Sequence, residues 1–138
     1  SAASDVYKRQ LNGHWSHVGE WSRKGAAALT AGWSGLASDD LTLVCGDFNA
    51  EPDAPEILDL MAMGNLSDTY ASARYRCRKE FGTYSTFFKE AIAGAKRIDY
   101  IFYRGDVEVD WACADEHIKF GLYISDHLPY QAVFKPTK

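Results

Sequence analysis

Three polar clusters fall at the ends of strand-like apolar segments, and they constrain the fold more than any other feature of the sequence. The clusters are Gly46-Asp47-Phe48-Asn49, Arg97-Ile98-Asp99-Tyr100 and Ser125-Asp126-His127-Leu128-Pro129. Each places a carboxylate within or just beyond an apolar run, where it costs desolvation free energy unless it is paired, hydrogen-bonded or bound to a metal. Three such positions in one small chain predict that the clusters converge on one polar site.

Apolar periodicity predicts a mixed order of helices and strands around these clusters. Residues 20–36 carry apolar side chains at three-to-four-residue spacing, which indicates a helix, and residues 54–63 indicate a second, shorter one. Strands are predicted at 41–45, 98–103, 107–111 and 130–134, and 82–88 has the composition of a strand or an aromatic loop. The all-apolar run at 41–45 predicts a strand buried on both faces. A length of 138 residues allows one domain at most.

Composition and charge exclude several classes of protein. With 46% hydrophobic and 25% charged residues, the chain is globular rather than disordered. No apolar run approaches the roughly 20 residues needed to cross a bilayer, so we expect no membrane span. The net charge of −4 gives no support for a DNA-coating protein, which needs Lys and Arg to neutralise phosphates. A phosphate substrate is still compatible, because bound divalent cations reverse the local field.

Cysteine usage predicts the redox compartment. Cys45, Cys77 and Cys113 are odd in number, far apart and without C-x-x-C spacing, so neither a zinc ribbon nor a disulfide scaffold is expected. Reduced thiols, and therefore a cytoplasmic location, are the simplest interpretation.

Taken in order, the three clusters resemble the signature of the endonuclease/exonuclease/phosphatase (DNase I-like) superfamily, in the C-terminal half of its domain. The matching segments are GDFN, RIDYIF and SDHLP, with GTYSTFF at 82–88 resembling the family's GT-aromatic segment. Residues 12–20 resemble its N-T-H-x-D-H-x-G-E segment but depart from it at Gly13 and Ser16. The resemblance runs from about Asn12 to Phe134 and implies an α/β fold, the four-layer α/β sandwich. This chain would form a partial domain of about one sheet plus its helices.

The resemblance implies a divalent-metal-dependent phosphoesterase that hydrolyses phosphodiester or phosphomonoester bonds with an activated water. Asp47 would orient or deprotonate that water and lie at the metal together with Asp126. Asn49 would donate hydrogen bonds to a phosphate oxygen, and Gly46 would allow a backbone turn that a side chain would obstruct. Hard oxygen ligands favour Mg²⁺ or Mn²⁺ as the cofactor.

Two histidines complete the implied set of catalytic residues. His127 would contact the phosphoryl group as a donor or as an acid/base, and Asp99 would orient it, as carboxylates orient imidazoles in other hydrolases. His14 would be the second histidine facing the phosphate, and Arg97 is a weaker candidate for a substrate or structural contact. The substrate would be a phosphate ester, which the motifs leave open as a nucleic acid, nucleotide, phospholipid or sugar phosphate.

Family members are roughly twice as long as this chain, and their first half brings an Asn and a metal-binding Glu that nothing before Asn12 supplies. Residues 1–10 are interpreted as a non-native or disordered tail, since SDVYKRQ resembles translated sequencing-adapter read-through; an ordinary polar tail is the alternative. Residues 11–138 are then a partial domain lacking its N-terminal half. We expect an uncovered sheet face that favours self-association, and impaired hydrolysis.

Each motif also has an interpretation without catalysis. Asp47 could cap a following helix, residues 97–102 could be an ordinary core strand, and 125–129 a turn before a strand. His14 and His17 have a zinc-like spacing, but no further ligands support it. As an alternative function, the chain could be a catalytically inactive scaffold that serves as a binding module.

Overall fold

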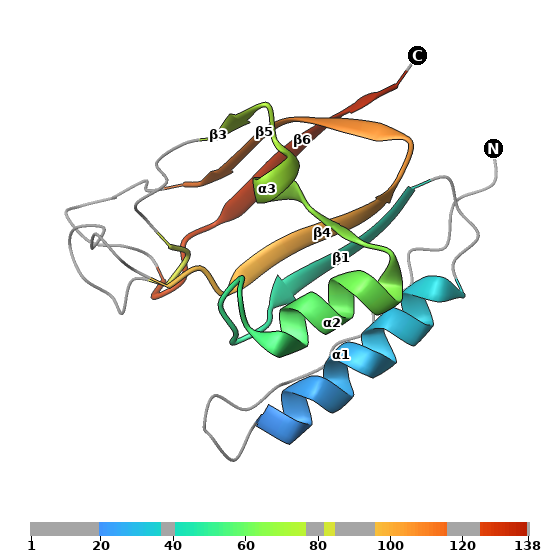
Figure 1. Ribbon diagram of the computed structural model, residues 1–138. Helices are drawn as coiled ribbons and strands as arrows, with labels where there is room; N and C mark the ends of the chain where they lie inside the picture. The colour runs from blue at the N-terminus through green and yellow to red at the C-terminus, as the bar shows by residue number, and fades with distance from the viewer. Residues whose placement is uncertain (1–19, 37–40, 77–81, 85–95, 116–124, 138) are drawn as a thin grey trace.

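The structure is a computed structural model that describes residues 20–36, 41–76, 82–84, 96–115 and 125–137. Along the chain its elements are α1 (Glu20–Gly35), β1 (Leu41–Asp47), α2 (Pro55–Gly64), β2 (Ser67–Asp68), α3 (Thr69–Ser72), β3 (Tyr75–Arg76), β4 (Asp99–Gly105), β5 (Val107–Ala114) and β6 (Tyr130–Pro136) (Figure 1). The mixed α/β class is confirmed, as are both predicted helices and the strands predicted at 41–45, 98–103, 107–111 and 130–134. Of the segment 82–88, only 82–84 is described.

The strands form two small sheets rather than the single sheet expected from the sequence. One has the order β1-β4-β2 and the other β3-β5-β6. The chain turns at Gly105, where β4 ends, so that β5 leaves β4 and pairs with β6. The short strand β2 pairs with β4 at Phe102 and Tyr103, while β1 runs antiparallel to β4 along its whole length. The Tyr103 and Phe134 rings, 5.6 Å apart, join the two sheets.

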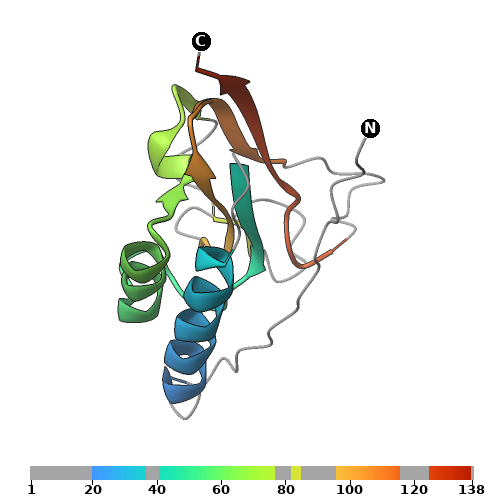
Figure 2. The ribbon, with the colours of Figure 1, turned by 90° about the vertical axis from the view of Figure 1, so that its right-hand side faces the viewer.

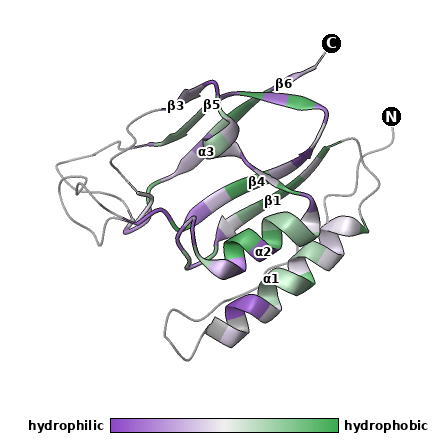
Figure 3. Ribbon diagram, in the orientation of Figure 1, coloured by the Kyte–Doolittle hydropathy of each residue, from purple (hydrophilic) through white to green (hydrophobic). Residues whose placement is uncertain are grey.

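The two long helices cover one face of the β1–β4 pair, where they lie side by side (Figures 1 and 2). Side chains on a strand alternate between its faces, so Tyr100 and Phe102 of β4 point together into this layer. They pack against Ile57 and Leu60 of α2, and α1 adds small side chains to the same core, Ala27 and Ala31. The apolar stretch of α2 lies at this contact (Figure 3).

The opposite face of β1 is exposed, which contradicts the prediction that this strand is buried on both faces. Leu43 is 48% exposed, and Leu41 and Cys45 on the same face are exposed as well. The apolar run could not show this, because the helices cover only the face that carries Val44.

Two further observations bear on the environment of the protein. Cys113 is disulfide-bonded, and Cys45 is free. The interpretation of three reduced thiols is therefore wrong for Cys113, and the cytoplasmic location stays a prediction without that support. Within the described ranges, no helix has the length and apolar character required to traverse a membrane.

Candidate active site

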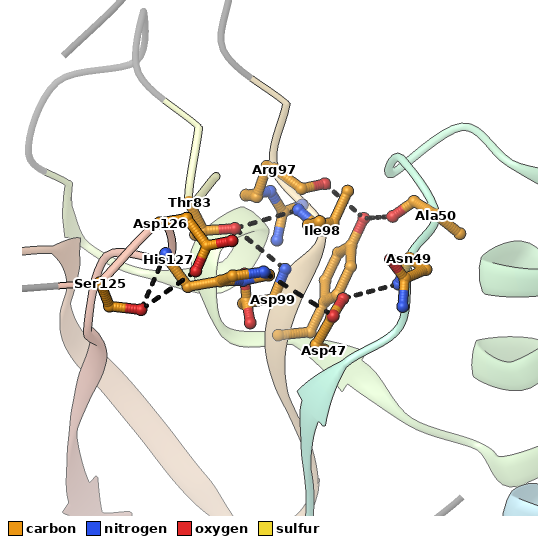
Figure 4. A network of polar contacts seen from close by, with 11 residues as sticks. Asp47, Asn49, Ala50, Thr83, Arg97, Ile98, Asp99, Ser125, Asp126 and His127 are labelled. Carbon is orange, nitrogen blue, oxygen red and sulfur yellow. Dashed lines mark hydrogen bonds and ion pairs between the residues drawn. The ribbon is translucent and has the colours of Figure 1, made fainter. Parts of the chain in front are cut away.

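Asp47 and Asp99 lie opposite each other at one end of the β1–β4 pair. They are register partners, because β1 ends at Asp47 where β4 begins at Asp99. His127, from the loop before β6, reaches both: its Nδ1 lies 2.8 Å from Asp99 Oδ2 and its Nε2 lies 3.9 Å from Asp47 Oδ2 (Figure 4). The three polar clusters thus meet at one place, as the sequence predicts.

The loop after β1 fixes the direction of the Asp47 carboxylate. The backbone N–H of Asn49 donates to Asp47 Oδ1 at 2.8 Å, and Asn49 adopts the left-handed conformation (φ 51°) that asparagine tolerates. Gly46 precedes them with φ 150°. A Cβ at Gly46 would meet nothing within 4 Å, so a side chain there would not be obstructed as the resemblance suggested. Glycine is favoured at this position by the positive φ alone. The other oxygen, Oδ2, faces His127.

Asp47 does not cap the following helix. Helix α2 begins at Pro55 with Ala54 as its N-cap, and no side chain caps it. The helix-capping interpretation of the GDFN motif is therefore wrong, and the Asp47 carboxylate faces the site.

His127 is held by groups on several sides. In the tautomer that its contact with Asp99 favours, Nδ1 donates to the carboxylate, so Nε2 is directed towards Asp47. The Tyr84 ring lies edge-on, 5.3 Å from the imidazole. The backbone N–H of His127 donates to Ser125 Oγ at 3.1 Å, so Ser125 shapes the turn.

Both members of the Asp99–His127 pair bind protons more tightly than usual. Burial raises the pKa of Asp99, as does the charge of Asp47, and the hydrogen bonds from Thr83 and His127 only partly offset them. Burial lowers the pKa of His127, but its bond to Asp99 and the negative charges around it outweigh burial, so the pKa is raised. Those charges belong to Asp99, Asp47 and Asp126.

This pair predicts a pH-dependent contribution of His127 to stability. A raised pKa in the folded state means that the contribution is fully present below the ordinary value of 6.5 and is lost as pH rises through the folded-state pKa. In EDTA, we expect the free energy of unfolding to differ most between wild type and His127→Gln below pH 6.5, and the difference to shrink above it. Urea unfolding on both sides of pH 6.5 measures this. A difference that stays constant or grows with pH would contradict it, and Asp99→Asn should flatten the wild-type dependence.

The remaining predicted site residues are placed differently. Asp126 lies beside His127, and its Oδ1 accepts from Ser125 Oγ at 3.4 Å; its metal role stays a prediction. Arg97 binds Asp68 through its two terminal guanidinium nitrogens, Nη2 at 2.5 Å and Nη1 at 3.2 Å. Its guanidinium also lies over the Tyr100 ring at 4.4 Å, so Arg97 is a structural contact. His14 lies outside the described residues.

Asp47, Asp99 and His127 form a group that could hold a metal ion, because one ligand atom from each lies within 4.8 Å of the others. Two carboxylates suit a hard divalent cation, and imidazole is a common ligand of transition metals. The Asp99 carboxylate is already hydrogen-bonded to His127. The Asp47 carboxylate takes no part in that hydrogen bond. The donor set therefore fits a divalent ion without specifying which one.

The fold and the site define an α/β protein with a carboxylate–histidine group that could hold a cation. A family model described as the Endonuclease/Exonuclease/phosphatase family matches residues 6–127. The chain belongs to the endonuclease/exonuclease/phosphatase family.

Solved structures share this fold. An endonuclease/exonuclease/phosphatase from Bacteroides vulgatus is 25% identical, with a TM-score of 0.73 over 90% of this chain and 48% of its own. A mannosyl-6-phosphatase of Bacteroides thetaiotaomicron VPI-5482 is 23% identical, with a TM-score of 0.71 over 88% of this chain and 49% of its own. A protein of unknown function from Enterococcus faecalis V583 is 22% identical, with a TM-score of 0.72 over 96% and 53%. The chain thus spans about half the length of these structures. No curated protein matches it.

Proposed function

We propose that this site hydrolyses phosphate esters, diesters or monoesters, with a water activated at a bound divalent cation. The observation that carries the proposal is the Asp47–His127–Asp99 arrangement, in which Nε2 of His127 and Oδ2 of Asp47 face each other 3.9 Å apart. Family membership supports the substrate class, because it implies a phosphoester substrate.

Each residue has a distinct part in this proposal. Asp47, with Asp126, holds the cation, and Mg²⁺ or Mn²⁺ supplies positive charge against the phosphate oxygens and lowers the pKa of water. Asp47 also orients that water. His127 offers Nε2 to the phosphoryl group as a donor or as an acid/base, and Asp99 fixes its tautomer. The Asn49 side chain donates to a phosphate oxygen. His14 is assigned as a second histidine that faces the phosphate.

The substrate is a nucleic acid, nucleotide, phospholipid or sugar phosphate. Turnover by the 138-residue chain alone is expected to be impaired, because the solved structures it matches are about twice as long. We also propose that the exposed face of β1, with Leu41 and Leu43, favours self-association.

The test is a panel of chromogenic phosphodiesters and phosphomonoesters with Mg²⁺ or Mn²⁺, repeated in EDTA. We expect slow, EDTA-sensitive hydrolysis that His127→Gln removes. Its kcat should lie well below roughly 1 s⁻¹, the lower end of typical enzyme turnover numbers. A rate above that value would overturn the impairment. A rate insensitive to EDTA and to His127→Gln would overturn the hydrolase proposal. Metal binding without any hydrolysis would instead favour the inactive scaffold.

A further inference from the structure

Thr83 lies where the two segments that carry Asp99 and His127 come together. Its side chain is buried, with only 1% of the residue exposed. Its backbone N–H donates to the carbonyl of Lys96 at 2.9 Å, just before β4, and its carbonyl accepts from the N–H of Leu128 at 2.7 Å. The backbone of one residue therefore ties the start of β4 to the loop of His127.

The Thr83 hydroxyl adds bonds on the Asp99 side. Oγ1 accepts from the backbone N–H of Ile98 at 3.1 Å and of Asp99 at 3.0 Å (Figure 4). A hydroxyl offers two acceptor lone pairs and one donor proton. The two backbone N–H groups occupy both acceptor positions, so the oxygen is held between Ile98 and Asp99.

The His127 side of the pair is held through the neighbouring residues. Tyr84 forms an isolated bridge with His127, and its ring lies against the imidazole at 5.3 Å. Thr83 thus contacts Asp99 directly and reaches His127 through Leu128 and Tyr84. Moving Thr83 would change the relative placement of the carboxylate and the imidazole.

We propose that Thr83 is a positioning residue that sets the Asp99 carboxylate against the His127 imidazole and so directs Nε2 towards Asp47. Its effect on turnover rests on the proposed function, but its effect on the Asp99–His127 hydrogen bond does not. Replacing a residue that hydrogen-bonds to an active-site side chain and orients it typically lowers activity about 10- to 100-fold.

The test compares three variants of the 138-residue chain. Thr83→Val keeps the branched shape and removes the hydroxyl, Thr83→Ser keeps the hydroxyl, and Thr69→Val removes a different buried hydroxyl, bonded to Tyr130. The readout is the proton resonance of the His127 Nδ1–H group, assigned by its absence in His127→Gln. We expect Thr83→Val to lose this resonance and about 10- to 100-fold of any EDTA-sensitive rate. Thr83→Ser should retain most of both, and Thr69→Val should leave the resonance in place.

Several outcomes would overturn the proposal. One is an unchanged resonance in Thr83→Val, and another is its equal loss in Thr69→Val. If Thr83→Val does not fold, the wild-type chain still decides, since the backbone amide protons of Ile98 and Asp99, which are donated to Thr83 Oγ1, should be protected from exchange. Rapid exchange of these two amide protons would count against the role. A resonance that Thr83→Val loses and Thr83→Ser keeps, in a chain that shows no hydrolysis, would support the positioning and reject the proposed function instead.

Discussion

Asp47→Asn is expected to reduce the divalent-metal-dependent rate to that of the EDTA-treated chain, a loss of about 10³-fold where the wild-type rate allows it to be measured. The amide keeps the shape of the side chain but removes the negative charge that faces His127 Nε2 at 3.9 Å. Asp99 cannot replace that charge, because its carboxylate is bonded to His127. Initial rates with a chromogenic phosphodiester, together with Mn²⁺ binding by calorimetry, measure the effect.

Asp53→Asn is the matched control for this prediction. Asp53 lies in the same loop and is exposed, and its substitution makes the same change in charge outside the metal-binding group. We expect it to leave the rate and Mn²⁺ affinity close to wild type. If both variants lose activity equally, the effect of Asp47 is one of general charge and not of its position at the site.

Asp68→Ala is expected to destabilise the fold by about 3–5 kcal/mol, because it leaves a buried guanidinium without its partner. The Arg97 and Asp68 side chains are only 14% and 6% exposed, and the contact is bidentate. Asp68 also accepts from the backbone N–H of Tyr70 at 3.0 Å and so caps α3. Urea unfolding gives the free energy directly, and a loss below about 1 kcal/mol would contradict the prediction.

An exposed ion pair in the second sheet provides the comparison. Lys135 binds Asp110 at 2.8 Å, but these side chains are 56% and 25% exposed. Exposed pairs contribute about 0–1 kcal/mol, since water screens them, so Asp110→Ala should cost far less than Asp68→Ala. Equal losses would mean that burial does not decide the strength of the Asp68–Arg97 contact.

The Asp68–Arg97 pair also explains why sequence patterns left the role of Arg97 open. The two residues are 29 positions apart, and Asp68 falls in a segment that looks like a connector. Nothing local indicates that β2 pairs with β4 and brings Asp68 beside the start of that strand. Thr83 had a weak signal, the GT-aromatic segment, but its hydrogen bonds to Ile98 and Asp99 depend on the folded chain.

Burial of β1 is a second case in which local pattern was insufficient. A short apolar run is compatible with one or two covered faces, because the pattern shows which side chains avoid water but not which partners are present. The helices cover the Val44 face, while Leu43 on the other face is exposed.

The sequence by itself determined the order of helices and strands and the three polar clusters, because apolar period and the cost of desolvating a carboxylate are local properties of the chain. The family followed from the order of those clusters. Only the tertiary structure decided that Arg97 binds Asp68, that one face of β1 is exposed, and that the strands divide into two sheets. These outcomes depend on strand register and on the directions of side chains far apart in sequence, as the alignment of Asp47 with Asp99 across β1 and β4 shows.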